Sequence, residues 1–283
     1  MIYLILSIFL FAVNNILWSY FSQNNPPILL IARRAIFTSL LFVALLLILK
    51  INITEDLTLQ GLFKIIIICS CGFTGLICLI KGFSIGNLSQ YSIYSLLMTV
   101  VFAIIKPNEK TNLDFWLPLI IAGIGFLYFI WNQFQEVSFG KSIKKPHGFF
   151  LLAHVFFGLS MYLQYDFLLD KSTSSLTVAS FQEFFILILA SLLVFFQKNT
   201  ISKNVKVSLK TWHYFIMSIP ISFAIIMGLE GLRRTAPFDA SLIGLYTPIS
   251  TVALGSILGI DRFEWKSLIG VVIMTIGVVL IYY

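Results

Sequence analysis

Residues 239–282 read DASLIGLYTPISTVALGSILGIDRFEWKSLIGVVIMTIGVVLIY, two apolar runs separated by a short charged segment. Each run is about 20 residues long, which is the length that a helix needs to cross the hydrocarbon core of a bilayer. Lipid offers no partner for free backbone N–H and C=O groups, so such runs cross as helices. This stretch therefore predicts two membrane-spanning helices joined by a tight loop.

Eight further apolar runs of similar length fill most of the chain. With the two above at 239–259 and 265–282, we expect helices at 2–21, 28–49, 61–80, 88–105, 114–131, 149–168, 175–196 and 213–232. The 283 residues are 59% hydrophobic and 11% charged, too few polar groups for a soluble domain of ordinary size. The first run has no basic leader, so we expect a retained helix rather than a cleaved signal peptide. The predicted fold class is an all-α membrane protein of ten transmembrane helices.

The net charge of +7 falls mainly in the segments between the apolar runs. Cations in such loops contact anionic head groups, so we expect membrane lipid as a partner and no nucleic acid. The cysteines Cys69, Cys71 and Cys78 share one apolar run without further ligands beside them, which predicts small buried residues and no metal site. The sequence has no P-loop, so we expect no ATPase activity and no cofactor.

An internal repeat relates the two halves of the chain. A shift of 152 positions (246 − 94) aligns Tyr94 with Tyr246, Ser95 with Thr247, Thr99 with Thr251, Gly125 with Gly277, and the pair Glu109, Lys110 with Asp261, Arg262. We therefore predict a first repeat at 1–131, a linker at 132–147 and a second repeat at 148–283. Because each repeat has an odd number of helices, the two repeats are inverted relative to one another.

Residues 228–283 resemble the second repeat of the EamA-type transporters of the drug/metabolite transporter superfamily. The resemblance rests on small residues before a proline, an acidic residue, and a final helix with glycines: Ala236, Ala240, Ser241, Tyr246, Thr247, Pro248, Asp261, Gly270, Val271 and Gly277. Residues 82–130 look similar, with Ser89, Tyr94, Glu109 and Gly125. The sequence departs from the family pattern where Leu96 replaces a frequent proline and where Asp261 replaces the usual glutamate.

This resemblance implies a substrate cavity between the halves and export or exchange of amino acids or similar small metabolites. It also implies a multi-pass protein of the bacterial inner membrane with both termini in the cytoplasm. The matching loops of both halves carry the same excess of cations, so the two inverted halves favour conflicting orientations. When the three lysines of the linker are added, termini in the cytoplasm place about seven cations inside and about ten outside, which weakly favours the reverse orientation. We expect the chain to act as a monomer, since ten helices in two repeats can close a cavity without a partner.

Three ionisable side chains within the predicted helices are candidate functional groups, because charges at membrane depth are costly. Glu183 lies deep in its span and is our candidate for coupling, by taking up a proton or pairing with a substrate ammonium. It could instead make a structural hydrogen bond with Gln182 or another helix. Arg33 or Arg34 could hold a substrate carboxylate or phosphate, or could extend to the interface.

Neutral polar and aromatic side chains form the remaining candidate site. The first helix contributes Asn14, Asn15 and Trp18, whose partners could be another helix or a ligand. Two symmetry-related helices contribute Gln90, Tyr91, Tyr94, Ser95, Tyr246, Thr247 and Ser250. These stripes fit a cavity for a small amphipathic molecule or a helix-helix interface, and Pro248 favours the cavity because it interrupts backbone pairing.

The sequence thus predicts a secondary transporter for an amino acid or related amphipathic compound, working by alternating access. S-adenosylmethionine or a nucleotide-type metabolite is an alternative substrate, and a proton or a counter-substrate is the expected coupling partner. Two alternatives from other classes are a membrane-embedded enzyme and a non-transporting scaffold. The enzyme is disfavoured because the histidines His147, His154 and His213 each lie near the start of a predicted helix without a clustered carboxylate.

Overall fold

The computed structural model describes residues 1–22, 25–51, 58–86, 88–105, 113–133, 144–169, 173–196, 209–259 and 263–282. The helices are α1 (Ile2–Ser22), α2 (Pro27–Ile48), α4 (Leu59–Ile85), α5 (Leu88–Ile93), α6 (Ser95–Ile105), α7 (Leu113–Gln133), α8 (Lys144–Leu169), α9 (Ser175–Phe196), α11 (Thr211–Leu232), α12 (Pro237–Gly244), α13 (Tyr246–Ile257) and α14 (Ser267–Tyr282). No strand occurs among the described residues. The predicted all-α class is confirmed.

Every predicted span contains a helix of the structure. Across the described residues, eight helices are long and apolar enough to cross a membrane, and two shorter apolar helices, Tyr91–Ile105 and Ser267–Tyr282, complete the set of ten. The predicted linker at 132–147 overlaps the helices at both ends, because α7 ends at Gln133 and α8 begins at Lys144. The charged pairs Glu109, Lys110 and Asp261, Arg262 lie outside the described residues.

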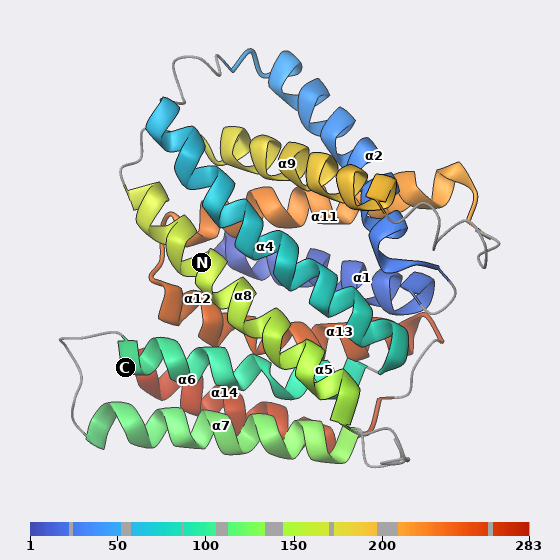
Figure 1. Ribbon diagram of the computed structural model, residues 1–283. Coiled ribbons are helices and arrows are strands. Elements are labelled where there is room, and N and C mark those ends of the chain that lie inside the picture. Colours follow the sequence, from blue (N-terminus) through green and yellow to red (C-terminus); the bar gives the residue numbers. More distant parts are fainter. Residues whose placement is uncertain are drawn as a thin grey trace.

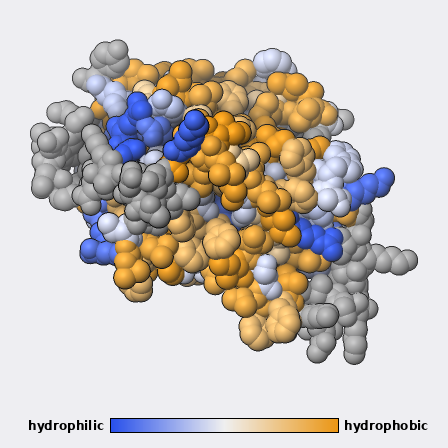
Figure 2. Space-filling model, turned by 90° about the horizontal axis from the view of Figure 1, so that it is seen from above, coloured by the Kyte–Doolittle hydropathy of each residue, from blue (hydrophilic) through white to orange (hydrophobic). Residues whose placement is uncertain are grey.

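The outer surface of the helices is strongly apolar. Side chains such as Leu40, Ile124 and Phe184 are exposed over more than half of their area in the middle of their helices. Figure 2 shows a broad hydrophobic area, with hydrophilic residues gathered toward two ends of the molecule. A protein with such a surface would aggregate in water, whereas lipid tails solvate apolar side chains. The chain is therefore a multi-pass integral membrane protein.

The helices pair in a reciprocal pattern between the two halves. The first helix of each half packs on the third helix of the other, which pairs α1 with α11 and α8 with α4. The second helices pair with each other as α2 and α9, and the last helices as α7 and α14, which lie together at one edge of the bundle (Figure 1). Reciprocity of this kind is the pattern expected of two repeats related by a two-fold axis.

The contacts between α7 and α14 follow the 152-residue shift between the repeats. A side chain at Gly125 would overlap the backbone of Gly270 and Met274, and one at Gly277 would overlap the backbone of Pro118 and Ala122. These two sets of neighbours differ by 152 positions, so the two contacts are equivalent under the repeat. The numbering falls along one helix as it rises along the other, and the two helices are antiparallel.

The fourth span of each half is broken into two helices. The break lies at Tyr94 between α5 and α6, and at Leu245 between α12 and α13. Pro248 accounts for the second break, because it has no N–H to bond the Gly244 carbonyl. The first break has no proline; there Tyr94 leaves the helical pattern while its hydroxyl lies 3.0 Å from Nδ1 of His147 on α8.

Candidate functional site

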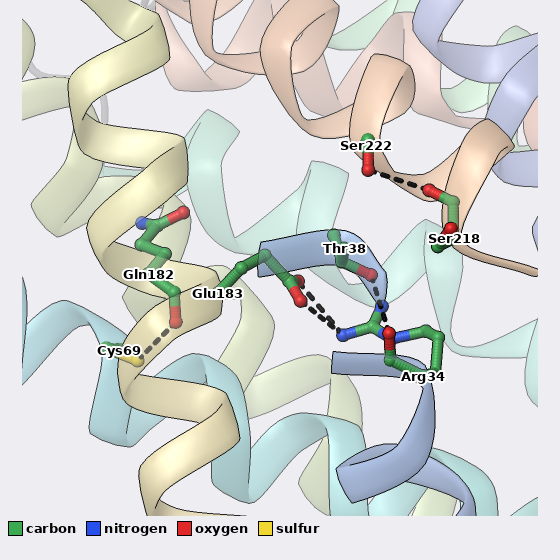
Figure 3. A network of polar contacts seen from close by, with 7 residues as sticks. All are labelled: Arg34, Thr38, Cys69, Gln182, Glu183, Ser218 and Ser222. Carbon is green, nitrogen blue, oxygen red and sulfur yellow. Dashed lines mark hydrogen bonds and ion pairs between the residues drawn. The ribbon is translucent and has the colours of Figure 1, made fainter. Parts of the chain in front are cut away.

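A buried ion pair joins the two central helices of the halves. The guanidinium nitrogen Nη2 of Arg34 on α2 donates to both carboxylate oxygens of Glu183 on α9, at 2.7 and 3.0 Å. Each side chain is 1% exposed, and the two point toward one another in Figure 3. Charges this deep are costly unless they are paired, so the helices α2 and α9 are locked together here.

The surroundings of the pair leave several polar atoms unsatisfied. Among the described residues, Nε of Arg34, Nε2 of Gln182, Oδ1 of Asn14 and Nε1 of Trp18 are buried without a hydrogen-bond partner. The backbone of Gln182 is anchored by Sγ of Cys69, which donates to its carbonyl at 3.3 Å. The Arg34 guanidinium carbon also lies 5.6 Å from the centre of the Trp18 ring. Buried polar atoms are normally satisfied, so this cluster fits a place where a ligand or water completes the set.

A cavity of about 410 Å³ opens beside the ion pair. Its walls come from both halves and include Asn14, Asn15, Arg34, Gln182, Glu183 and Thr247, set among apolar side chains. That size and that mixture of an apolar wall with a few polar groups are typical of small-molecule sites. The cavity therefore fits an amphipathic molecule of modest size.

The cavity begins near one face of the bundle. Its lining reaches Leu4 in the first turn of α1 and Leu232 at the end of α11, the membrane face that also carries the end of α14. Further along α1, Trp18 and Phe21 belong to a buried cluster with Phe83. The lining also includes Leu79 on α4 and Tyr91 on α5, which lie toward the opposite ends of their spans, so the cavity extends past the middle of the bundle.

The broken helix α5/α6 and α8 form another wall of the cavity. Tyr91 and Ser95 line it from the break, and His154 lines it from α8. His154 is 5% exposed and its Nε2 lies 3.5 Å from Oγ of Ser95. The Thr99 hydroxyl, one turn beyond Ser95, donates to the Ser241 carbonyl at 3.1 Å and ties α6 to α12.

The predicted site residues divide into two groups. Those that line the cavity are Asn14, Asn15, Tyr91, Ser95, Glu183 and Thr247. Those that do not are Trp18, which lies behind Arg34, together with Arg33, Tyr94, Tyr246 and Ser250. The side chain of Gln90 lies outside the described part of the chain. Substrate binding by any of these residues stays a prediction.

Arg34, rather than Arg33, faces the cavity. Neighbouring residues on a helix point about 100° apart, so one arginine can enter the bundle while the other turns away. Arg33 donates to the Tyr214 hydroxyl at 3.3 Å, and its guanidinium lies over the Tyr214 ring. Glu183 accepts hydrogen bonds from Arg34 on another helix and also lines the cavity, and its role in coupling stays a prediction.

Polar residues that are not among the predicted site residues also line the cavity, Gln182 and His154 among them. The sequence predicts Gln182 only as a possible partner of Glu183, yet Gln182 itself lines the cavity. The sequence predicts His154 near the start of a helix, but α8 begins at Lys144 and the apolar span at Pro146, so His154 lies well inside the span. A polar side chain deep in an apolar run is the signal that could have found both.

Two comparisons with known proteins bear on this geometry. Residues 144–283 match the EamA-like transporter family. The second half of the chain belongs to the EamA-like transporters. A solved structure, titled only as the crystal structure of a protein, superposes on the chain with a TM-score of 0.71, covering 98% of this chain and 96% of the other at 14% identity. That likeness extends the fold, though not the activity, to the first half. No curated protein matches the chain.

The EamA-like match confirms the resemblance seen in Gly228–Tyr283. The family consists of membrane transporters of the drug/metabolite type rather than enzymes. Both the matched half and the first half contribute walls to the cavity, since Glu183 comes from one and Arg34 from the other.

Proposed function

We propose that the chain is a secondary transporter of the bacterial inner membrane that moves a small amphipathic metabolite, such as an amino acid, by alternating access. The observation that carries the proposal is the buried Arg34–Glu183 pair in the wall of a cavity between two pseudo-symmetric halves. A purely structural ion pair needs no empty volume beside it. Export or exchange is the expected mode, as the EamA resemblance implies.

Arg34 is our candidate for binding an anionic group of the substrate. Its Nη2 is engaged by Glu183, but its Nε has no partner among the described residues, and neither has Nε2 of Gln182. These two unpaired donors suit the oxygens of a carboxylate, which binds arginine strongly because the hydrogen bonds are charge-assisted. The apolar remainder of the wall suits the carbon skeleton of the same molecule.

Glu183 is our candidate for coupling. A substrate carboxylate that engages Arg34 competes with Glu183, and a released carboxylate can take up a proton or a substrate ammonium group. Transport would then be linked to proton movement or to counter-exchange. The carboxylate lies between α2 and α9, the second helices of the two repeats. Breaking the ion pair there would alter the contact between the two halves.

One observation favours a membrane-embedded hydrolase as a second candidate. Ser95 and His154 lie side by side at the cavity, with Nδ1 of His154 2.9 Å from the Phe150 carbonyl. A Ser-His pair can activate a nucleophile, but here a carbonyl stands where hydrolases of this kind place a carboxylate. No group of three metal-ligating side chains occurs among the described residues either. We therefore give transport precedence.

Uptake into proteoliposomes tests the proposal. The purified chain would be assayed with labelled amino acids, polyamines, nucleosides and S-adenosylmethionine, beside protein-free liposomes. In the variant Arg34→Leu the flux should fall at least tenfold. Its neighbour Arg33→Leu is the matched control and should keep most of it, because Arg33 faces Tyr214 rather than the cavity. No flux with any compound, together with turnover of a lipid ester, would replace the transporter by the hydrolase.

A further inference from the structure

The imidazole of His154 is held in one tautomer. Its Nδ1 lies 2.9 Å from the Phe150 carbonyl oxygen, and a carbonyl can only accept a hydrogen bond. Nδ1 therefore carries the hydrogen. No described acidic side chain forms an ion pair with His154, so we take the ring as neutral, and a neutral imidazole has a single N–H. Nε2 is then left with a lone pair and acts as an acceptor.

The ring is also fixed in orientation by aromatic neighbours. Tyr91 lies against it with ring centres 4.6 Å apart, and Tyr94 lies at 5.9 Å. Tyr91 in turn packs on Phe83 and Phe150, while the Tyr94 hydroxyl contacts His147. The acceptor atom Nε2 is thus held in place by α4, α5 and α8 together. Such support is what a precise binding point requires.

The Nε2 atom has little to bond within the protein. Among the described residues its hydrogen-bond partner is Oγ of Ser95 at 3.5 Å, which is the far limit of a hydrogen bond. Both residues line the cavity. Lys81 on α4 lies with its ammonium over the Phe149 ring. An acceptor that is buried, fixed and poorly satisfied at a cavity wall has a bond to offer to an occupant.

We propose that His154 Nε2, with Ser95 beside it, is the acceptor point of the cavity that receives an N–H or O–H group of the transported compound. The proposal deepens the transport function and rests on it for the identity of the occupant. The proposal gives the cavity a hydrogen-bond donor end and a hydrogen-bond acceptor end. The oxygens of the substrate face the donors of Arg34 and Gln182, and its amine or hydroxyl faces the wall formed by α8 and the break between α5 and α6.

The tautomer can be tested without any substrate. The chain has three histidines, so labelling with ¹⁵N-histidine gives three ring systems, assigned by substituting each histidine in turn. We expect His154 with its hydrogen on Nδ1 and an unprotonated Nε2. A hydrogen on Nε2 would overturn the proposal, because the cavity would then meet a donor.

Three small probes test recognition by the purified full chain in detergent. They are 2-phenylethylamine, 2-phenylethanol and the quaternary phenylethyltrimethylammonium ion, which share one ring and differ in whether they carry a hydrogen-bond donor. His154→Phe should weaken binding of the amine or the alcohol about tenfold, the equivalent of one good hydrogen bond, and leave the quaternary ion unchanged. His154→Gln should recover part of the loss, and His213→Phe, outside the cavity wall, is the control.

Each outcome of the probe experiment decides the point. A preference for the amine assigns the site to ammonium groups, and a preference for the alcohol assigns it to hydroxyl groups. Equal losses for all three probes, or no loss in His154→Phe, overturn the acceptor role even where transport is intact. Failure of both donor probes to bind the wild-type chain overturns it too. If the probes behave as expected but no compound is transported, the transport function fails and the binding point stands.

Discussion

Arg34 and Glu183 meet through a single guanidinium nitrogen, which lies 2.7 and 3.0 Å from the two carboxylate oxygens. Only Nη2 of Arg34 is hydrogen-bonded to the partner helix, and Nε of Arg34 has no hydrogen-bond partner among the described residues. The pair therefore has a structural role, which is to hold α2 to α9, and a binding role that we propose because both residues line the cavity. The two can be separated by experiment.

The structural role is tested by unfolding. Glu183→Gln leaves a buried guanidinium without a counter-charge and should cost about 3–5 kcal/mol of unfolding free energy, whereas the double variant Arg34→Met with Glu183→Leu should return close to the wild type. Thermal unfolding in detergent measures both. The double variant should nevertheless carry no flux. Normal flux in it would show that the pair is structural only.

The coupling role of Glu183 is tested by the pH profile of transport. If Glu183 exchanges a proton during the cycle, Glu183→Gln should flatten the dependence of flux on pH between about pH 5.5 and 8. The matched control is Glu230→Gln, since Glu230 is paired with Arg234 at the end of α11 and does not line the cavity. An unchanged profile in Glu183→Gln, with normal rates, would remove Glu183 from the coupling step.

Gly244 allows the cavity to be filled without disturbing the fold. It lines the cavity, and a Cβ built on it meets nothing within 4 Å. Gly244→Leu should therefore reduce flux at least tenfold while thermal stability stays within about 1 kcal/mol, because Gly-to-larger changes in helices are mild where space exists. Gly244→Ala should remain active. Full flux in Gly244→Leu would mean that the substrate passes elsewhere.

The repeat symmetry makes a quantitative prediction at the α7–α14 contact. Gly125→Val and Gly277→Val each drive a side chain into the facing backbone, so each should cost about 3 kcal/mol or more. Because the two contacts are equivalent under the 152-residue shift, their losses should agree within about 1 kcal/mol. Gly148→Ala, where a Cβ meets nothing within 4 Å, is the control. Strongly unequal losses would argue against a shared packing mode.

Topology gives a further prediction. The described residues form five membrane spans before the linker and five after it, if each broken helix is taken as one span, so a reporter fused within the linker before Lys144 and one fused after Tyr283 should report opposite sides of the membrane. With the termini in the cytoplasm, the linker reporter is periplasmic. Two reporters on the same side would contradict the five-plus-five count, and exchanged sides would reverse the orientation only.

The spans were predictable because the bilayer imposes one length and one polarity on every crossing segment. The helix ends were less so: Lys144 and Lys145 read as linker, although α8 begins there. That misplaced start also hid His154, whose depth in the span was underestimated. No proline in the sequence indicates the break at Tyr94. The Tyr94 ring contacts His147 and His154 on α8, which is distant in the sequence.

The composition of the site was more predictable than its geometry. Glu183 and an arginine of the second helix stood out because charges are costly at membrane depth. Which arginine faces inward depends on the rotation of a helix that is apolar on all sides, and no pattern in 28–49 reveals that rotation. Tyr246 and Ser250 share a stripe with Thr247, yet the Tyr246 hydroxyl turns to Thr275 on α14. Packing between distant segments decided these cases.

The central claim is that the chain is a carrier whose cavity binds a small zwitterion or related compound through Arg34. Counterflow in proteoliposomes tests it most directly: vesicles loaded with unlabelled leucine, phenylalanine or S-adenosylmethionine are diluted into a trace of the same labelled compound. We predict transient accumulation of at least one label above equilibrium with the wild type and with Arg33→Leu, and none with Arg34→Leu. Absence of counterflow for all three in the wild type, or its persistence in Arg34→Leu, would contradict the account.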